Sequence, residues 1–220
     1  MALTWSRFAA APATRDSSPR QLRAIVGQSE RCLLGFCRRR ASHSKLDPVP
    51  GSTSSASPKA LPGLVWLPSD PDSASRASIK AWSATEGLAN VRAPVAIDVR
   101  GGVWGVEDDA PFDAMISLNM VHITPWEAAL GLLAGAGRLL RPDGILFLYG
   151  PFMLGGTHTA ASNAAFDADL KRRDPRWGVR DVDDLVGEAA PHWLELREIV
   201  EMPVNNLSLV FVKAGPPVPV

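Results

Sequence analysis

Polar side chains that can bind a ligand stand at the ends of short apolar runs in this chain. Asp70, Asp98, Asn119 and Tyr149 each close such a run, and His122 follows Asn119 by three residues. In α/β nucleotide sites, an acidic residue at the end of a strand commonly accepts hydrogen bonds from ribose hydroxyls. Because the carboxyl ends of parallel strands share one edge of a sheet, the pattern predicts that these five residues open on one crevice.

The apolar runs alternate with helical patterns from residue 61 onward. This order predicts an α/β fold with a doubly wound, mostly parallel sheet and an antiparallel C-terminal hairpin. Thr124 is expected to be the N-cap of one helix, with Pro125 in its first turn. The expected strands are 64–67, 94–99, 114–120, 145–150, 194–202 and 207–213, and the expected helices are 71–88, 124–140, 160–173 and 182–189.

Residues 1–60 differ in composition from the rest of the chain. They are rich in Arg, Ser and Pro and hold ten Lys and Arg against three Asp and Glu, whereas the whole chain holds 23 of each. No lasting helical or strand period is recognisable there. We therefore expect three parts: a poorly ordered segment 1–60 without a central strand, a domain 61–214, and a tail 215–220. The charge distribution disfavours binding to nucleic acid.

Several other classes are also disfavoured. Cys32 and Cys37 lack the second pair that a zinc knuckle needs, so no metal site is expected. No apolar run reaches 18 residues, and the first residues lack a secretory pattern, so the sequence predicts no membrane span and a cytoplasmic location. The oligomeric state is left open.

Short motifs across residues 61–213 together resemble the methyltransferase-like 26 family of class I S-adenosylmethionine-dependent methyltransferases. The resemblance is carried in order by Trp66-Leu-Pro-Ser-Asp70, Asn119-Met-Val-His122-Ile, Tyr149-Gly-Pro-Phe152, Ser162-Asn163 with Phe166-Asp167, Arg176-Trp177-Gly178-Val-Arg180-Asp181 and Met202-Pro-Val-Asn205-Asn206.

The resemblance implies a Rossmann-like methyltransferase sheet with S-adenosylmethionine as cofactor. It implies that Asp70 accepts the ribose hydroxyls, that Asp98 lies near the adenine and that Asn119 flanks the methionine part. His122 and Tyr149 then face the substrate and are the candidate catalytic residues. A small molecule is the expected methyl acceptor.

The chain departs from the family before residue 61, where a strand and a loop of the form Leu-Glu-x-x-Ser-Gly-x-Gly-Gln-His are expected. Read in a shifted frame, residues 43–59 can encode Leu-Glu-Val-Gly-Ser-Gly-Ala-Gly-Gln-His followed by Val-Val-Arg-Phe-Ala-Glu, which restores that loop at the expected length. We interpret the segment as frame-shifted. The alternative is an organelle-targeting leader, which is also rich in Arg and Ser and poor in acidic residues.

Each site residue also has a structural interpretation. Asp70 and Asp98 can be helix caps, His122 can be a hydrogen-bonded structural residue, and Tyr149 can simply pack its ring. The segment from Arg176 to Asp181 can be a structural clasp as readily as a substrate lid.

The sequence thus favours a methyltransferase, with two rival functions. One is a non-catalytic remnant that cannot bind the cofactor without its glycine loop, so enzymatic activity is left open. The other is an oxidoreductase of the same layered class, which the terminal hairpin disfavours.

Overall fold

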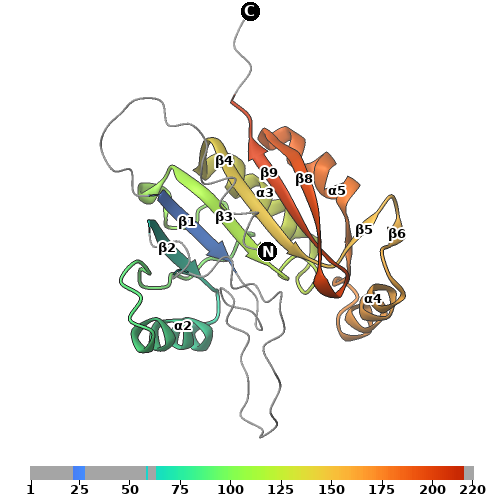
Figure 1. The fold of residues 1–220 in the computed structure, drawn as a ribbon, viewed down its shortest axis with the longest axis horizontal. Coiled ribbons are helices and arrows are strands. Elements are labelled where there is room, and N and C mark those ends of the chain that lie inside the picture. The colour runs from blue at the N-terminus through green and yellow to red at the C-terminus, as the bar shows by residue number, and fades with distance from the viewer. Residues whose placement is uncertain (1–21, 28–57, 59–62, 216–220) are drawn as a thin grey trace, which may run out of the picture.

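A central sheet of six strands organises the computed structural model, which describes residues 22–27, 58 and 63–215, the first of these ranges by its backbone alone. The strand order is β2-β1-β3-β4-β9-β8, and β2, β1, β3 and β4 are parallel (Figure 1). The strands are β1 (Leu22–Gly27), β2 (Leu64–Ser69), β3 (Phe112–Leu118), β4 (Leu140–Gly150), β8 (Leu194–Met202) and β9 (Asn206–Lys213).

The presence of β1 corrects the expectation that residues 1–60 contain no central strand. Leu22 to Gly27 pairs along its whole length with β2, and its last four residues pair with β3. A gap between β2 and β3 would leave backbone donors and acceptors on both strands without ladder partners, which costs free energy at every group. A six-residue strand closes both ladders, although the run is too short to show a period.

The C-terminal hairpin confirms the expected end of the sheet. β9 pairs antiparallel with both β4 and β8. The short helix η4 (Pro203–Asn205) joins the two hairpin strands, with left-handed backbone at Val204 and Asn205. The sheet is therefore parallel on one side and antiparallel on the other, as the sequence predicts.

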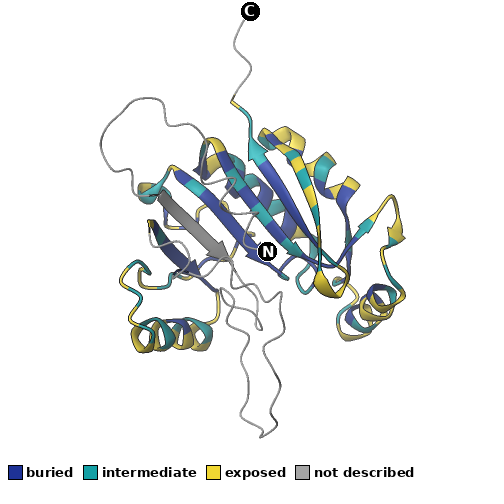
Figure 2. Ribbon diagram, in the orientation of Figure 1, coloured by how far each residue is buried: buried dark blue, intermediate teal, exposed yellow. Residues whose placement is uncertain are grey.

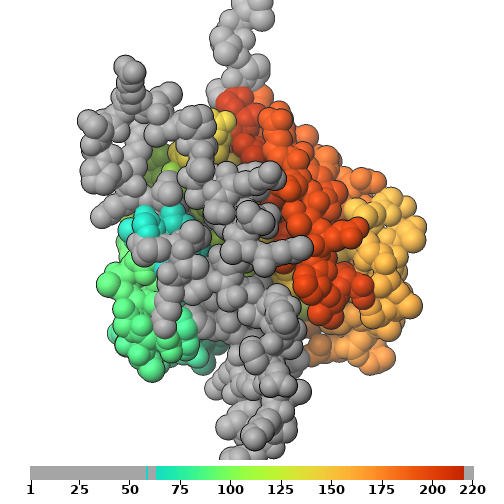
Figure 3. Space-filling model, in the orientation of Figure 1, coloured from blue at the N-terminus to red at the C-terminus, as the bar shows by residue number. Residues whose placement is uncertain are grey.

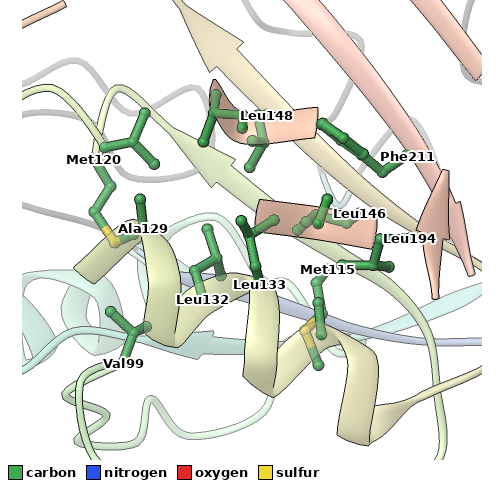
Figure 4. Packing of buried hydrophobic residues seen from close by; sticks show 14 of the residues in the cluster. Val99, Met115, Met120, Ala129, Leu132, Leu133, Leu146, Leu148, Leu194 and Phe211 are labelled. Atoms are coloured by element: carbon green, nitrogen blue, oxygen red, sulfur yellow. The ribbon is translucent and has the colours of Figure 1, made fainter. Parts of the chain in front are cut away.

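Helices α3 and α5 cover one face of the sheet (Figure 1). In α3 the residues Ala129, Leu132 and Leu133 recur at helical spacing and pack against strand residues such as Leu146 and Phe211 (Figure 4). β3 alternates between this cluster and a second cluster on the opposite face, so it is buried on both sides, as a central parallel strand requires. The helices are α2 (Ser73–Thr85), α3 (Trp126–Leu139), α4 (Ala161–Arg173) and α5 (Val182–Ala189), with short helices η2 (Glu107–Asp109) and η3 (Ala190–His192).

Two local expectations are wrong. Residues 94–99 form no strand, and this part of the chain meets β2 only through isolated bridges from Val91 to Trp66 and from Val95 to Ser69. Thr124 does not cap α3: Pro125 is the N-cap, and the Thr124 hydroxyl donates instead to the carbonyl of Met120 at 2.9 Å. The Thr-Pro pair therefore fixes the turn before the helix rather than the helix end itself.

A small second sheet follows β4 in the chain. It has the order β6-β5-β7, from β5 (Phe152–Leu154), β6 (Thr157–His158) and β7 (Arg180–Asp181), and α4 lies between β6 and β7 in sequence. Figure 2 shows that burial is concentrated in the central strands and α3, whereas α2 and α4 are largely exposed. No helix among the described residues is long and apolar enough to cross a membrane.

Candidate functional site

Two adjoining cavities lie at the carboxyl end of the parallel strands. We name them the Asp98 cavity, of about 300 Å³, and the His122 cavity, of about 680 Å³. Ile123 and Trp177 line both cavities, so the two share a wall. The other described lining residues of the Asp98 cavity include Ser69, Ile97, Val99, Arg100, Met120, Asp174 and Arg176, and those of the His122 cavity are Asn119, Pro151, Ser162, Asn163, Phe166, Arg173, Val204 and Asn206, with His122 itself.

The turn after β3 places side chains in both cavities. Asn119 adopts a left-handed backbone with φ of 57°, which asparagine tolerates better than most residues. Its backbone N–H donates to the Tyr149 carbonyl at 2.8 Å, which ties the start of the turn to β4. As a result Met120 lines the Asp98 cavity, while Asn119 and His122 line the larger one.

His122 is completely buried, and neither ring nitrogen has a hydrogen-bond partner among the described residues. Its ring meets Phe152 edge-on, with centroids 5.4 Å apart. Burial, followed by the positive charge of Arg180, lowers the pKa of His122 to about 3. The imidazole is therefore neutral at neutral pH and offers one donor and one acceptor nitrogen.

Gly150 makes room for this imidazole at the end of β4. A Cβ at Gly150 would lie 2.1 Å from His122 Nε2 and 3.1 Å from Asn119 Oδ1. Only glycine fits there, because the ring occupies the position of the missing side chain. The same contacts place the imidazole and the Asn119 amide oxygen close together at one point of the cavity wall.

Asp98 lines the cavity that carries its name, and Arg100 holds its carboxylate. The guanidinium binds both oxygens, with the shortest contact from Nη2 to Oδ2 at 2.6 Å. This hydrogen bonding keeps the pKa of the Asp98 carboxyl below its usual value, so the group is an anion at neutral pH. About half of the side chain remains exposed, and it can accept a further hydrogen bond.

Asp70 and Tyr149 are not among the described residues that line either cavity. Asp70 is buried, and its Oδ1 accepts from the backbone N–H of Asp72 at 2.8 Å, while the neighbouring Ser69 and Pro71 reach the Asp98 cavity. Tyr149 packs on the far face of the sheet, and its hydroxyl is 2.9 Å from Asn206 Nδ2, which donates to it. Of the five predicted residues, three line the cavities: Asp98, Asn119 and His122. Asp70 and Tyr149 instead contact residues that line them.

The segment from Arg176 to Asp181 contains both residues that line a cavity and residues with a structural role. Arg176 and Trp177 line the Asp98 cavity, and Arg176 forms an ion pair with Asp174 at 2.8 Å. Arg180 is a clasp: its guanidinium donates to the backbone carbonyls of Val121, Thr124 and Arg176 at 2.8–2.9 Å. These bonds hold the His122 turn against the Trp177 segment.

Asp181 is also structural. Its carboxylate caps α5 by accepting from the N–H of Asp183 at 2.8 Å, and it accepts from the N–H of Gly156 at 2.5 Å. It therefore fixes the start of α5 and the β5–β6 connection rather than a cavity wall.

Arg173 is a cavity residue that no motif of the sequence indicated. It ends α4 within the run Lys171-Arg172-Arg173. Such a run is typical of a helix C-terminus, because cations there interact favourably with the negative end of the helix dipole. Arg173 lines the His122 cavity together with Val204 and Asn206 of the β8–β9 hairpin. The hairpin lies next to the α4 region (Figure 3), and Asn205 donates to Ser162 Oγ at 3.1 Å. Only the tertiary arrangement distinguishes Arg173 from the two basic residues before it.

The chain belongs to the family described as "Protein of unknown function (DUF938)", whose sequence pattern matches residues 52–213. The match contains every described residue that lines the two cavities.

Solved methyltransferases share the fold. The mitomycin 7-O-methyltransferase MmcR is 14% identical, with a TM-score of 0.65 over 89% of this chain and 49% of that one. The S-adenosylmethionine-dependent methyltransferase SibL is 18% identical, with a TM-score of 0.63 over 89% and 51%. An O-methyltransferase family protein from Burkholderia thailandensis is 14% identical, with a TM-score of 0.62 over 87% and 51%. The chain thus spans about half the length of these proteins, and it has their Rossmann-like methyltransferase fold.

Proposed function

We propose that this protein is an S-adenosylmethionine-dependent methyltransferase that acts on a small molecule. The observation that carries the proposal is the pair of adjoining cavities at the carboxyl edge of a methyltransferase sheet, with the neutral and unpartnered His122 in the wall of the larger one. A binding site for two ligands that react with each other needs two such compartments in contact.

The Asp98 cavity fits the adenosine part of the cofactor. Ile97, Val99 and Met120 supply apolar walls for a flat ring system, and Asp98 supplies an anionic acceptor at its edge. We propose that Asp98 lies near the adenine and that Asn119 flanks the methionine part. For Asp70 the ribose role is kept as a proposal, since its neighbours Ser69 and Pro71 reach the same cavity.

The cofactor supplies an activated methyl group on a sulfonium, and the chain has to align the acceptor atom and exclude water. Asn119 and His122 line the larger cavity, and both ring nitrogens of His122 are buried without a hydrogen-bond partner among the described residues. The strongly lowered pKa of His122 makes it a weak proton acceptor, so we propose that it orients the acceptor through hydrogen bonds. Tyr149 contributes by positioning Asn206, which lines the cavity.

We propose in addition that the chain is related to the methyltransferase-like 26 family and that residues 43–59 are read in a shifted frame. Apart from residue 58, that segment lies outside the described residues, so the motif strings between residues 61 and 213 support the relationship. The nucleotide sequence of the gene tests the frame directly: nucleotides whose shifted frame encodes Leu-Glu-Val-Gly-Ser-Gly-Ala-Gly-Gln-His support the hypothesis, and nucleotides that encode another string there contradict it.

A second candidate function is a cofactor-free remnant of the fold, which the unrecognisable glycine loop favours. Calorimetric titration with S-adenosylmethionine separates the two candidates, using the chain as given and a chain carrying Leu-Glu-Val-Gly-Ser-Gly-Ala-Gly-Gln-His in the restored frame. Binding by the chain as given supports the proposal, binding by the restored chain alone supports the remnant, and absence of binding from both chains contradicts the cofactor assignment.

The same titration tests the residues. Asp70→Ala and Asp98→Ala should each weaken binding by roughly 1.5–3 kcal/mol, the usual worth of hydrogen bonds to a charged group. Asp108→Ala is the matched control, because Asp108 is exposed on η2 and lines neither cavity. Equal losses in all three variants would contradict the assigned roles.

A further inference from the structure

Charge is distributed unevenly among the described residues that line the His122 cavity. Arg173 is the one cation among them, and none of them is Asp or Glu. His122 carries no charge at neutral pH because its pKa is lowered to about 3. A bound molecule in this cavity therefore meets a single fixed positive charge.

The Arg173 guanidinium is weakly engaged by the protein itself. Its carboxylate neighbour is Asp169, at 3.9 Å from Nη1, and Arg172 already binds that carboxylate closely. Nearly half of the Arg173 side chain is exposed, and its guanidinium carbon lies 6.0 Å from the centre of the Trp177 ring. Donors of the guanidinium thus remain available at the cavity wall.

The remaining walls suit a flat apolar molecule. Phe166 and Trp177 present aromatic side chains, and Ile123 and Pro151 add apolar surface. The amide hydrogens of Asn163 are occupied by Thr159 Oγ1 and the Asn205 carbonyl, at 2.9 and 2.8 Å. A cavity of about 680 Å³ accommodates a molecule of two or three fused rings.

We propose that the acceptor is a planar, mainly apolar molecule that carries an anionic group, such as a carboxylate, and that Arg173 binds this group. The inference rests on the proposed function, since it assigns the class of acceptor to the same site. An anion gains a charge-assisted hydrogen bond with a fixed planar donor, whereas a cation meets repulsion and finds no carboxylate among the described lining residues. Arg173 is then a specificity-determining residue rather than a catalytic one.

The test compares three probes of one shape: a hydroxynaphthoate, the neutral hydroxynaphthamide and the cationic aminomethylnaphthol. Calorimetry measures their binding to the full chain, with and without S-adenosylmethionine. We expect the naphthoate to bind about tenfold or more tightly than the amide, and the amine to bind most weakly. Arg173→Met should remove the preference for the anion while leaving the affinity for the amide within about twofold.

Arg197→Met is the matched control, because Arg197 lies on β8, is paired with Glu195 and lines neither cavity. Binding of S-adenosylmethionine is measured on every variant and should not change, since Arg173 does not line the Asp98 cavity. Equal affinity for the three probes, no binding of any of them, or an unchanged preference in Arg173→Met would each overturn the inference. Loss of cofactor binding throughout, with the anion preference intact, would instead contradict the proposed function and leave only the anion-binding role of Arg173 standing.

Discussion

Acidification should destabilise this protein through His122. The side chain is fully buried, both nitrogens lack partners among the described residues, and its pKa is lowered from 6.5 to about 3, first by burial and then by the charge of Arg180. The unfolded chain exposes the same imidazole to water, where it takes up a proton near its ordinary pKa. Folding therefore expels a proton at mildly acidic pH.

The sign and size follow from proton linkage. Above pH 6.5 the imidazole is neutral in both states and contributes no pH dependence. Between 6.5 and about 3 only the unfolded chain is protonated, so the free energy of unfolding falls as the pH falls. The free energy of unfolding falls by about 1.36 kcal/mol for each pH unit below 6.5. The loss at pH 5 is therefore roughly 2 kcal/mol.

Urea unfolding followed by tryptophan fluorescence at pH 7 and pH 5 measures this loss. His122→Asn should lose about 2 kcal/mol less than the parent chain between the two conditions, because asparagine does not titrate. Carboxyls with lowered pKa values, such as Asp98 and Asp174, also lose stability on acidification, but they are present in both chains and cancel. His192→Asn is the control, since His192 is partly exposed on η3. Identical pH dependence in the parent chain and His122→Asn would refute the argument.

Three further substitutions test structural contacts around the site. Gly150→Ala should lower the free energy of unfolding in urea by about 1–3 kcal/mol, because the new Cβ overlaps His122 Nε2. Its control, Gly187→Ala in α5, has open space around the new Cβ and should raise the free energy of unfolding by up to about 1 kcal/mol. Arg180→Met should lower the free energy of unfolding by roughly 2–3 kcal/mol, since three backbone carbonyls lose a charged donor. An effect below about 0.5 kcal/mol is within the range of surface substitutions and would contradict the structural role of Arg180. Asp181→Ala should cost about 1–2 kcal/mol in thermal unfolding through loss of the α5 cap, with Asp181→Asn retaining most of it.

Elements with a strong period could be predicted from the sequence. The run from Ala114 to Leu118 is apolar on both faces, which requires a buried central strand, and β3 is that strand. The Ala-rich period around Leu132 and Leu133 likewise identified α3. These signals are local, because the side chains that decide burial lie within one strand or helix.

The errors arose where pairing, rather than pattern, decides the structure. Leu22 to Gly27 becomes a strand because β2 and β3 each need a ladder partner, and this need is invisible in six residues of a basic segment. Conversely, Pro94 to Val99 has the composition of a strand, but Val95 forms only one isolated bridge to β2. The remainder of that run lines the Asp98 cavity through Ile97 and Val99.

The site shows the same division. Asn119 and His122 could be selected because residues that follow parallel strands converge by topology. Asp98 also lines a cavity, although the run before it forms no strand. Tyr149 could not be placed correctly, since alternation along β4 sends its ring to the opposite face, where its hydroxyl accepts from the Asn206 side chain. Arg173 depends on how α4 docks, which no local spacing encodes.

The acceptor side and the cofactor side of the site depend on different parts of the chain. Every described residue of the His122 cavity lies at or beyond Asn119, and Arg180, with the Gly178 N–H bonded to the His122 carbonyl at 2.9 Å, holds that region together. The edge at β1, where the glycine loop of this fold class contacts a bound nucleotide cofactor, depends on residues before Leu64. The proposed change of frame in residues 43–59 is therefore expected to alter cofactor affinity, whereas every described lining residue of the His122 cavity, including Arg173, lies far beyond it in the sequence. Binding of the acceptor probes therefore tests the His122 cavity separately from the residues before Leu64.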